Sequence, residues 1–268
     1  MSKVYEIFGC PKRDGLAFGC EFELESINAT GVGFDALFSA VTDDNSLRNN
    51  GKEFITKPLP LEKIVQAHAY IFNGTSVAFE NMDDVCTDRC STHIHVNFSD
   101  VDEEKVRQFI RLYCLIEPLF LNVVGESRKN NIYCVPIAST NLLRQVLTKH
   151  LDYLAETWHK YAAFNVKPLS NLGTIEFRHF EATMDTAKLS RWLHMIANLY
   201  NFNMNYEVDV LITDSMLYRL VNAVSDIPYS RDDIYKMCED TLTNDLLLMV
   251  NPTKELLVQR LKQSKVTV

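Results

Sequence analysis

The chain has 268 residues, 47% of them hydrophobic and 23% charged, a composition typical of globular proteins rather than of disordered or fibrous ones. Its formal net charge of −8 weighs against a broad surface for nucleic-acid backbones, but leaves room for a local basic pocket that binds nucleotide phosphates. Seven scattered cysteines and an N-terminus without an apolar leader predict reduced thiols and a cytoplasmic protein with no membrane segment.

The first predicted elements are short strands and one helix. Residues 17–27 favour a strand that ends before turn-forming residues at 28–33. Residues 42–51 form a polar loop, and the short strand that follows it stops at Pro58. Apolar side chains then recur at helical spacing over residues 61–72.

Further along the chain, strands and helices continue in an irregular order. We expect a strand over residues 93–98, with Ser99 as the N-cap of the helix that follows it. A helical stretch over 141–161 precedes a strand over 173–180, and Asp185 is placed to cap the next helix.

This irregular order predicts an α+β fold rather than a doubly wound parallel sheet. The sequence has no GxxxxGK[ST] phosphate loop and no GxGxxG after a predicted strand, which disfavours the common nucleotide-binding folds. No repeat or linker divides residues 1–268, so we expect a single domain. Its helical C-terminal part, about 205–268, shows no sign of chemistry.

Three of the predicted strands each carry two polar residues two positions apart. These pairs are Glu21 and Glu23, His93 and His95, and Glu176 and Arg178. Residues i and i+2 share a face of a strand, so each pair points to one side while the apolar residue between them points to the other. Three pairs built from Glu, His and Arg suggest one sheet whose polar face holds cations and an anionic substrate, which indicates an enzyme.

The acidic pair has two interpretations. Glu21 and Glu23 could lie on an exposed face, with Glu25 continuing the alternation, because burying unpaired carboxylates is costly. Carboxylate oxygens are also the expected ligands of Mg²⁺ or Mn²⁺, and Glu53 in the next strand could add a third.

The two histidines share their face with Asn97, which favours a functional role for His93 and His95. Zinc is the competing interpretation, because Cys86 and Cys90 lie just upstream. A structural zinc site would, however, leave the glutamates without a role.

The third pair, Glu176 and Arg178, could be a surface ion pair that contributes little to stability. Alternatively, Glu176 bridges metal ions and Arg178 contacts the oxygens of a phosphoryl group during transfer.

Six segments, in this order, resemble the putative amidoligase family over about residues 15–200: FGCEFELES, DDNSLRNNGKEFITKPL, CSTHIHVNF, SRKNNIYC, HKYAAFN and GTIEFRHFEATMD. That family comprises carboxylate–amine ligases related in fold to glutamine synthetase and glutamate–cysteine ligase. The resemblance implies a curved antiparallel sheet, packed with helices, that forms a funnel-like active site open at both ends.

The resemblance also implies a reaction. ATP would phosphorylate a small-molecule or peptide carboxylate to an acyl phosphate, and an amine would then displace phosphate, leaving an amide and ADP. Two or three Mg²⁺ or Mn²⁺ ions would be held by Glu21, Glu23, Glu53, Glu176 and one or both of His93 and His95. Catalytic roles would fall to Arg178, Glu53 and Glu176. Candidates for contacts with ATP or substrate are Arg128, Lys129, Lys160, Asn165, Asp44 and Ser46.

Two other functions stay open at this point. One is a guanidino or carboxylate kinase of the same fold, whose phosphorylated product is released rather than passed to an amine. The other is a non-catalytic binding module stabilised by zinc. The sequence names neither the acid nor the amine, and an oligomer is compatible with everything above.

Overall fold

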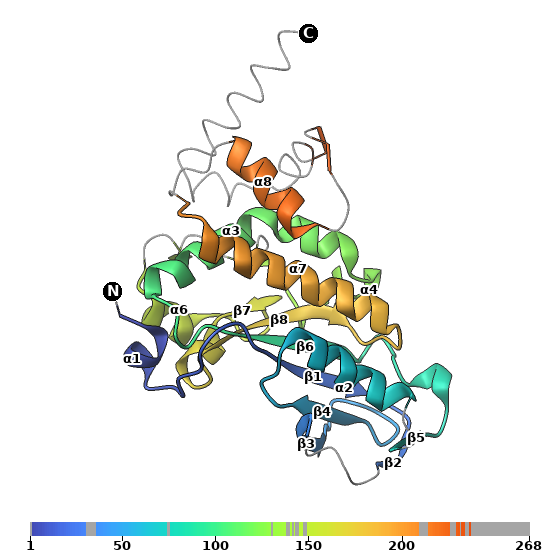
Figure 1. Cartoon of the computed structure of the whole chain (residues 1–268). Helices are drawn as coiled ribbons and strands as arrows, with labels where there is room; N and C mark the ends of the chain where they lie inside the picture. The colour runs from blue at the N-terminus through green and yellow to red at the C-terminus, as the bar shows by residue number, and fades with distance from the viewer. Residues whose placement is uncertain are drawn as a thin grey trace.

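A six-stranded antiparallel sheet organises the molecule (Figure 1). The computed structural model describes residues 2–236 except 31–35, 74–75, 130, 138–139, 141, 143–144, 147–148, 209–213, 226–228, 231 and 234–235. The strand order is β3-β4-β1-β6-β8-β7, and β2 pairs separately with β5. The strands are β1 Phe18–Leu24, β2 Ile27–Thr30, β3 Phe38–Asp43, β4 Lys52–Thr56, β5 Val77–Phe79, β6 Ser91–Asn97, β7 Phe164–Asn165 and β8 Thr174–Glu181.

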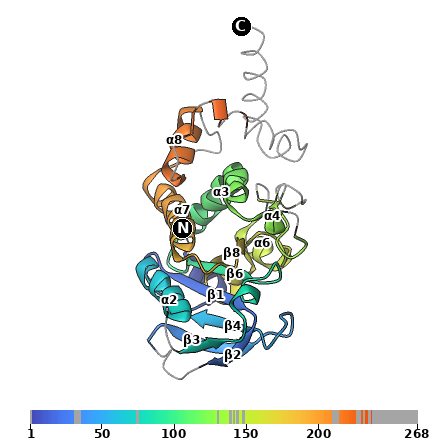
Figure 2. The same cartoon turned by 90° about the vertical axis from the view of Figure 1, so that its right-hand side faces the viewer.

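Helices cover one face of this sheet (Figures 1 and 2). The helices are α1 Val4–Phe8, α2 Leu61–Asn73, α3 Glu103–Val123, α4 Glu126–Lys129, α6 Leu151–Thr157, α7 Thr186–Asn205 and α8 Asp214–Val224, with short 3₁₀ turns at Met82–Asp84 and Lys167–Ser170. The α+β class with an antiparallel sheet and packed helices is therefore confirmed. The finer expectation of a sheet curved into a funnel stays a prediction.

The period-two alternation of the strands separates an apolar face from a polar one, as predicted. Phe22, Ile94 and Phe177 are buried on the helix-covered side. The ring of Phe22 lies 5.5 Å from that of His68 in α2, and Phe177 lies 5.6 Å from Tyr113 in α3. The polar members of the same strands point to the opposite face, which leaves them free to form a site.

A β-bulge in β8 adjusts this alternation beside the polar face. In the pairing of β6 with β8, Thr92 is opposite Phe180 and Ile94 is opposite Phe177, so Arg178 and His179 together face the single residue His93. The extra residue lets Phe177 and Phe180 both pack toward the helices, where Phe180 stacks on Trp192. Bulges re-aim side chains and are common next to active sites.

Several local predictions are confirmed and others are wrong. The side chain of Asp185 caps α7 by accepting hydrogen bonds from the backbone N–H groups of Ala187 and Lys188. Ser99 is not the N-cap of α3; that position belongs to Asp102, and the Ser99 hydroxyl instead donates to Asn97 Oδ1. Folding of residues 13–15 against β6 recruits this hydroxyl, because Ser99 Oγ also accepts from the backbone N–H of Arg13.

The first predicted strand is in fact two strands. β1 ends at Leu24 and β2 begins at Ile27, because Ser26 between them has a left-handed backbone with φ of 59°. The turn expected from residue 28 is strand β2 up to Thr30, and residues 31–33 lie outside the described residues. Serine rarely adopts the left-handed conformation, so the sequence pattern did not predict the break between β1 and β2.

Two later stretches are described only in part. Of the helix predicted over 141–161, the structure describes α6, while several residues before it lie outside the described set. Of the C-terminal part, α8 is described and residues 237–268 are not. Among the described helices, none has the length and apolar composition that crossing a lipid bilayer requires.

Replacing Phe177 with Ala should lower the free energy of unfolding by about 3–5 kcal/mol, because it leaves a cavity among the rings of Tyr113, Phe120 and Phe164. Urea denaturation measures this loss. The control Met184→Ala removes a side chain that is 44% exposed and should change stability by less than about 0.5 kcal/mol. Equal effects of the two substitutions would contradict the assigned core.

Candidate functional site

Strand register brings the predicted polar pairs onto one patch of the sheet. Three cross-strand partnerships do this: Glu21 with His93 across β1 and β6, Glu23 with Glu53 across β1 and β4, and His95 with Glu176 across β6 and β8. Side chains of directly opposed residues lie about 5 Å apart at Cβ. The pairs predicted separately from three strands therefore form a single cluster.

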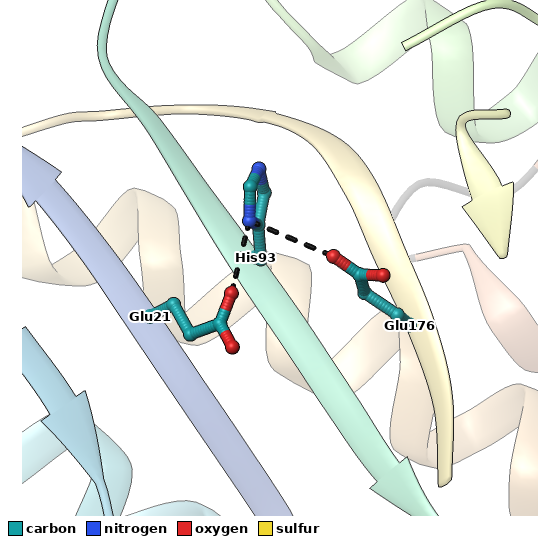
Figure 3. A group of neighbouring side chains, drawn as sticks. All are labelled: Glu21, His93 and Glu176. Atoms are coloured by element: carbon teal, nitrogen blue, oxygen red, sulfur yellow. Dashed lines mark hydrogen bonds and ion pairs between the residues drawn. The ribbon is translucent and has the colours of Figure 1, made fainter. Parts of the chain in front are cut away.

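His93 lies at the centre of the cluster and is 5% exposed. Its Nδ1 is 3.1 Å from Glu21 Oε2 and 3.6 Å from Glu176 Oε1, so two carboxylates converge on one ring nitrogen from strands on either side (Figure 3). On the other side of the ring, Nε2 is 2.9 Å from Ser91 Oγ and 3.8 Å from Glu23 Oε1. Both ring nitrogens thus face oxygen atoms.

The cluster contains two overlapping groups of potential metal ligands. Within each group the ligand atoms lie within 4.8 Å of one another; the groups are Glu21, His93 and Glu176, and Glu23, Glu53 and His93. Four carboxylates with one imidazole form a mostly hard, oxygen-rich donor set, which suits Mg²⁺ or Mn²⁺ better than a soft metal ion. The residues present therefore fit divalent cations of this kind.

The electrostatics of the cluster show crowding of negative charge. Burial, together with the negative charges of Glu21 and Glu23, raises the pKa of Glu53 to about 7. Burial would also raise the pKa of Glu21, but hydrogen bonds and charge from His93 and His95 prevail and hold it below its ordinary value. A bound cation would relieve the repulsion that keeps Glu53 partly protonated.

His95 lies beside the cluster, on the same face of β6 as His93. Its Nδ1 is 2.9 Å from Thr174 Oγ1, and its Nε2 is 3.4 Å from Glu21 Oε1 without a well-aligned hydrogen-bond partner in the described part of the chain. Burial lowers the pKa of His95, but the nearby carboxylate of Glu21 and the charge of Glu176 more than offset this and raise it. His95 belongs to neither ligand group, so its geometry favours orienting Glu21 over ligating a metal.

Glu176 is held by two other predicted residues. Its Oε2 accepts a 2.7 Å hydrogen bond from Asn165 Nδ2, and its Oε1 accepts one from Arg178 Nη1. Asn165 is itself fixed, because its Oδ1 accepts from the backbone N–H of Lys167. Asn165 thus positions Glu176, and a contact with ATP or substrate stays a prediction for it.

A cavity of about 640 Å³ opens beside the cluster. Glu23, Ser91 and His93 line its floor, beside Arg178. The wall toward β3 and β4 comes from Asp44, Ser46, Asp88 and Arg89, whereas the wall toward β8 comes from Ser127, Arg128, Asn131, Ile132, Tyr133 and Tyr161. One wall therefore carries two carboxylates and the Arg89 guanidinium, and the other carries aromatic rings and the Arg128 guanidinium next to Arg178.

The predicted ATP or substrate contacts divide into two sets. Asp44, Ser46 and Arg128 line the cavity. Lys129 and Lys160 do not: Lys129 forms an ion pair with Glu126 on α4, and Lys160 Nζ lies 4.5 Å above the ring of Tyr161. Contacts of these two lysines with a nucleotide stay a prediction.

One of the two interpretations of the acidic strand placed Glu25 on an exposed face, but Glu25 is only 2% exposed. Its Oε1 accepts from the backbone N–H of Arg48 and its Oε2 from Thr87 Oγ1. Arg89 Nε lies 3.5 Å from the same carboxylate, and Arg89 Nη2 donates to the carbonyl of Ser46. Because β1 ends just before it, Glu25 leaves the sheet pattern and ties two cavity loops together.

Sequence reasoning missed several residues of the cavity. Asp88, Arg89, Ser91, Tyr133 and Tyr161 all line it. Four of these five lie in loops, where no periodicity marks a direction, and their approach depends on how the loops fold over the sheet. Ser91 alone offered a signal, because it shares the face of His93 at the spacing used for the other pairs.

The structure does not support a zinc site of cysteines and histidines. Cys90 Sγ donates to the carbonyl of Val85, and neither Cys86 nor Cys90 belongs to a ligand group among the described residues. Burial raises the pKa of Cys86 to about 12 and that of Cys90 to about 11, which disfavours the thiolate that binds zinc.

Comparison with known protein families identifies a match over most of the sheet. Residues 32–200 match the model of a family described as "Putative amidoligase enzyme". No curated protein matches the chain. The matched segment includes Glu53, His93, Glu176 and Arg178 but starts after β1, so the residues on β1 enter the site through strand pairing rather than through this match.

Replacing Glu53 with Gln should stabilise the metal-free protein at about pH 8 and change little at about pH 5. The folded pKa of about 7 exceeds the ordinary value of 4.5, so the folded state holds a proton that the unfolded state has lost. The free energy of unfolding of the wild type therefore falls as pH rises between these values, and Gln, which does not ionise, escapes that fall.

Urea denaturation in EDTA across this pH range measures the effect. Glu62→Gln, at an exposed position of α2, is the matched control and should show no such pH-dependent difference. A Glu53→Gln variant whose advantage is equal at both pH values would contradict crowding of charge around Glu53.

Proposed function

The chain belongs to the putative amidoligase family, and from that premise we propose that it is an ATP-dependent carboxylate–amine ligase. The match over residues 32–200 confirms the predicted family resemblance. One observation carries the finer proposal. His93 belongs to both groups of potential metal ligands, and these lie at the floor of a cavity that Arg178 also lines. We further propose that the sheet forms a funnel open at both ends, which ATP enters from one side and the acid and amine from the other.

The cations of the reaction would be held by Glu21, Glu23, Glu53, His93 and Glu176. Divalent ions held there would neutralise part of the charge on the phosphate oxygens of ATP, which otherwise repels the attacking carboxylate. The two ligand groups suit two neighbouring ions, and the neutral imidazole of His93, which has one unprotonated nitrogen, would ligate one of them. The clustered carboxylates would also lose their mutual repulsion on binding them.

In the first step, an oxygen of the acid substrate attacks the γ-phosphorus of ATP. The bond from that phosphorus to the bridging oxygen of ADP breaks, and an acyl phosphate forms. Arg178 is suited to this step because Glu176 holds its Nη1, while its Nε has no hydrogen-bond partner among the described residues. A guanidinium fixed in this way presents preoriented donors to phosphoryl oxygens.

In the second step, the nitrogen of an amine attacks the acyl carbon, phosphate leaves with the electrons of the C–O bond, and the nitrogen loses a proton. Asp44 and Asp88 on the wall toward β3 and β4 supply the negative charge that attracts a cationic amine. The opposite wall carries Arg128 beside Arg178, whereas Arg89, on the same wall as the two aspartates, is paired with the buried Glu25. This separation of charge supports entry of amine and nucleotide from different sides.

A nucleotide–metal site is the first element to test. ATP with Mg²⁺ should raise the melting temperature of the wild type by several degrees, whereas the variant Glu21→Gln/Glu23→Gln should show almost no shift, because it lacks two carboxylates that hold the cations. Differential scanning fluorimetry measures both. The exposed pair Glu62→Gln/Glu156→Gln loses the same charge and should respond like the wild type. A full response in Glu21→Gln/Glu23→Gln would contradict the metal assignment.

Trapping by hydroxylamine separates the ligase from a kinase of the same fold. With ATP, Mg²⁺ and a panel of carboxylic acids, a ligase should produce a hydroxamate, because hydroxylamine attacks an acyl phosphate as an amine does. Colorimetric detection with iron(III) measures it, and Arg178→Lys should lower its rate by about 10²–10³-fold. A stable phosphorylated product without hydroxamate would favour a kinase.

A further inference from the structure

Arg128 is a buried cation with no anionic partner among the residues that the structure describes. It lies in the single turn α4 and is 3% exposed, yet it lines the cavity. Its side chain makes one hydrogen bond among the described residues, from Nη2 to the backbone carbonyl of Arg178 at 2.7 Å, and its Nε is buried without a partner. No ion pair joins it to a described carboxylate, whereas Arg178 has Glu176.

This arrangement is costly unless a ligand completes it. An arginine does not lose its proton in a protein, so burial cannot be relieved by neutralisation, and an uncompensated buried charge is strongly unfavourable. The neutral carbonyl of Arg178 offsets only part of that cost. An anion inside the cavity is the missing partner.

The neighbouring groups set the chemistry of that anion. Arg128 donates to the backbone carbonyl of Arg178, so the two arginines lie next to each other at one end of the cavity. The Nε of Arg178 is also buried without a hydrogen-bond partner among the described residues. Planar guanidinium forks match the paired oxygens of a carboxylate or phosphate. Tyr133, 55% exposed, and Ile132, 69% exposed, also line the cavity and offer apolar surface to a ring of the bound ligand.

We propose that Arg128 is an oxyanion-binding residue that anchors a phosphate or carboxylate group at the α4–β8 end of the cavity, separate from the carboxylate cluster that would hold cations. The inference deepens the proposed function and rests on it for the source of the oxyanion, either the phosphate chain of the nucleotide or a carboxylate of the acid substrate. Anion binding itself requires neither metal nor turnover.

The test measures binding in EDTA by isothermal titration calorimetry, with inorganic phosphate, ADP and glutarate as probes. Wild type should bind at least one probe, and Arg128→Gln should weaken that binding by more than about tenfold. Arg191→Gln, an exposed arginine on α7 over the opposite face of the sheet, is the matched control and should bind like the wild type.

The probes distinguish the source of the oxyanion. Loss of phosphate and ADP binding together in Arg128→Gln would assign the site to the nucleotide. Loss of glutarate binding with ADP binding retained would assign it to the acid substrate. If Arg128→Gln does not fold, Arg128→Lys takes its place; it keeps the charge but loses the fork and should still weaken binding.

Two results would overturn the proposal. One is a folded Arg128→Gln, or Arg128→Lys where Gln does not fold, that binds every probe within about twofold of the wild type. The other is a wild type that binds none of the probes in EDTA. Failure of the ligase proposal looks different, because it would appear as absence of metal-dependent ATP response and of hydroxamate while anion binding by Arg128 persists.

Discussion

Mutual repulsion among carboxylates on one face of a sheet is the constraint to which the rest of the site responds. Glu21 and Glu176 form one group with His93, and Glu23 and Glu53 form another; ligand atoms within each group lie within 4.8 Å of one another. Glu53 shows the consequence in its raised pKa. His93 lies between the carboxylates, with Nδ1 toward Glu21 and Nε2 toward Glu23. Such an arrangement is poor for stability alone and suits a site that binds positive charge.

The other contacts of the site hold these carboxylates in place. Ser91 donates from both its backbone N–H and its hydroxyl to Glu23, and Asn165 and Arg178 each bind one oxygen of Glu176. On the reverse face of the same strands, aromatic rings of α3 and α7 pack against Phe177 and Phe180. Packing on the apolar face holds the strands in place, so the polar face provides the rigid floor that catalytic geometry needs.

The loops add what a sheet alone cannot supply. Strand residues contribute most of the negative charge, whereas the cavity wall toward β8 receives Arg128 from α4, and the wall toward β3 and β4 receives Arg89 from the loop before β6. Glu25 ties that loop to the one after β3. Charges of both signs thus surround one cavity, which is what the proposed ligase reaction would require of a site that binds a nucleotide, an acid and an amine.

By itself, the sequence determined which residues could share a strand face, because the period of two is a local property of the chain. This period predicted the pairs on β1, β6 and β8. Apolar residues at helical spacing predicted α2, α3 and α7, and the preference of Asp for the N-cap predicted the role of Asp185. The tertiary structure decided the rest. Register placed Glu21 opposite His93, and the bulge in β8 set Arg178 and His179 against that same residue. The burial of Glu25 and Arg128 depends on partners far along the chain, and a pattern of neighbours in sequence carries no information about such contacts.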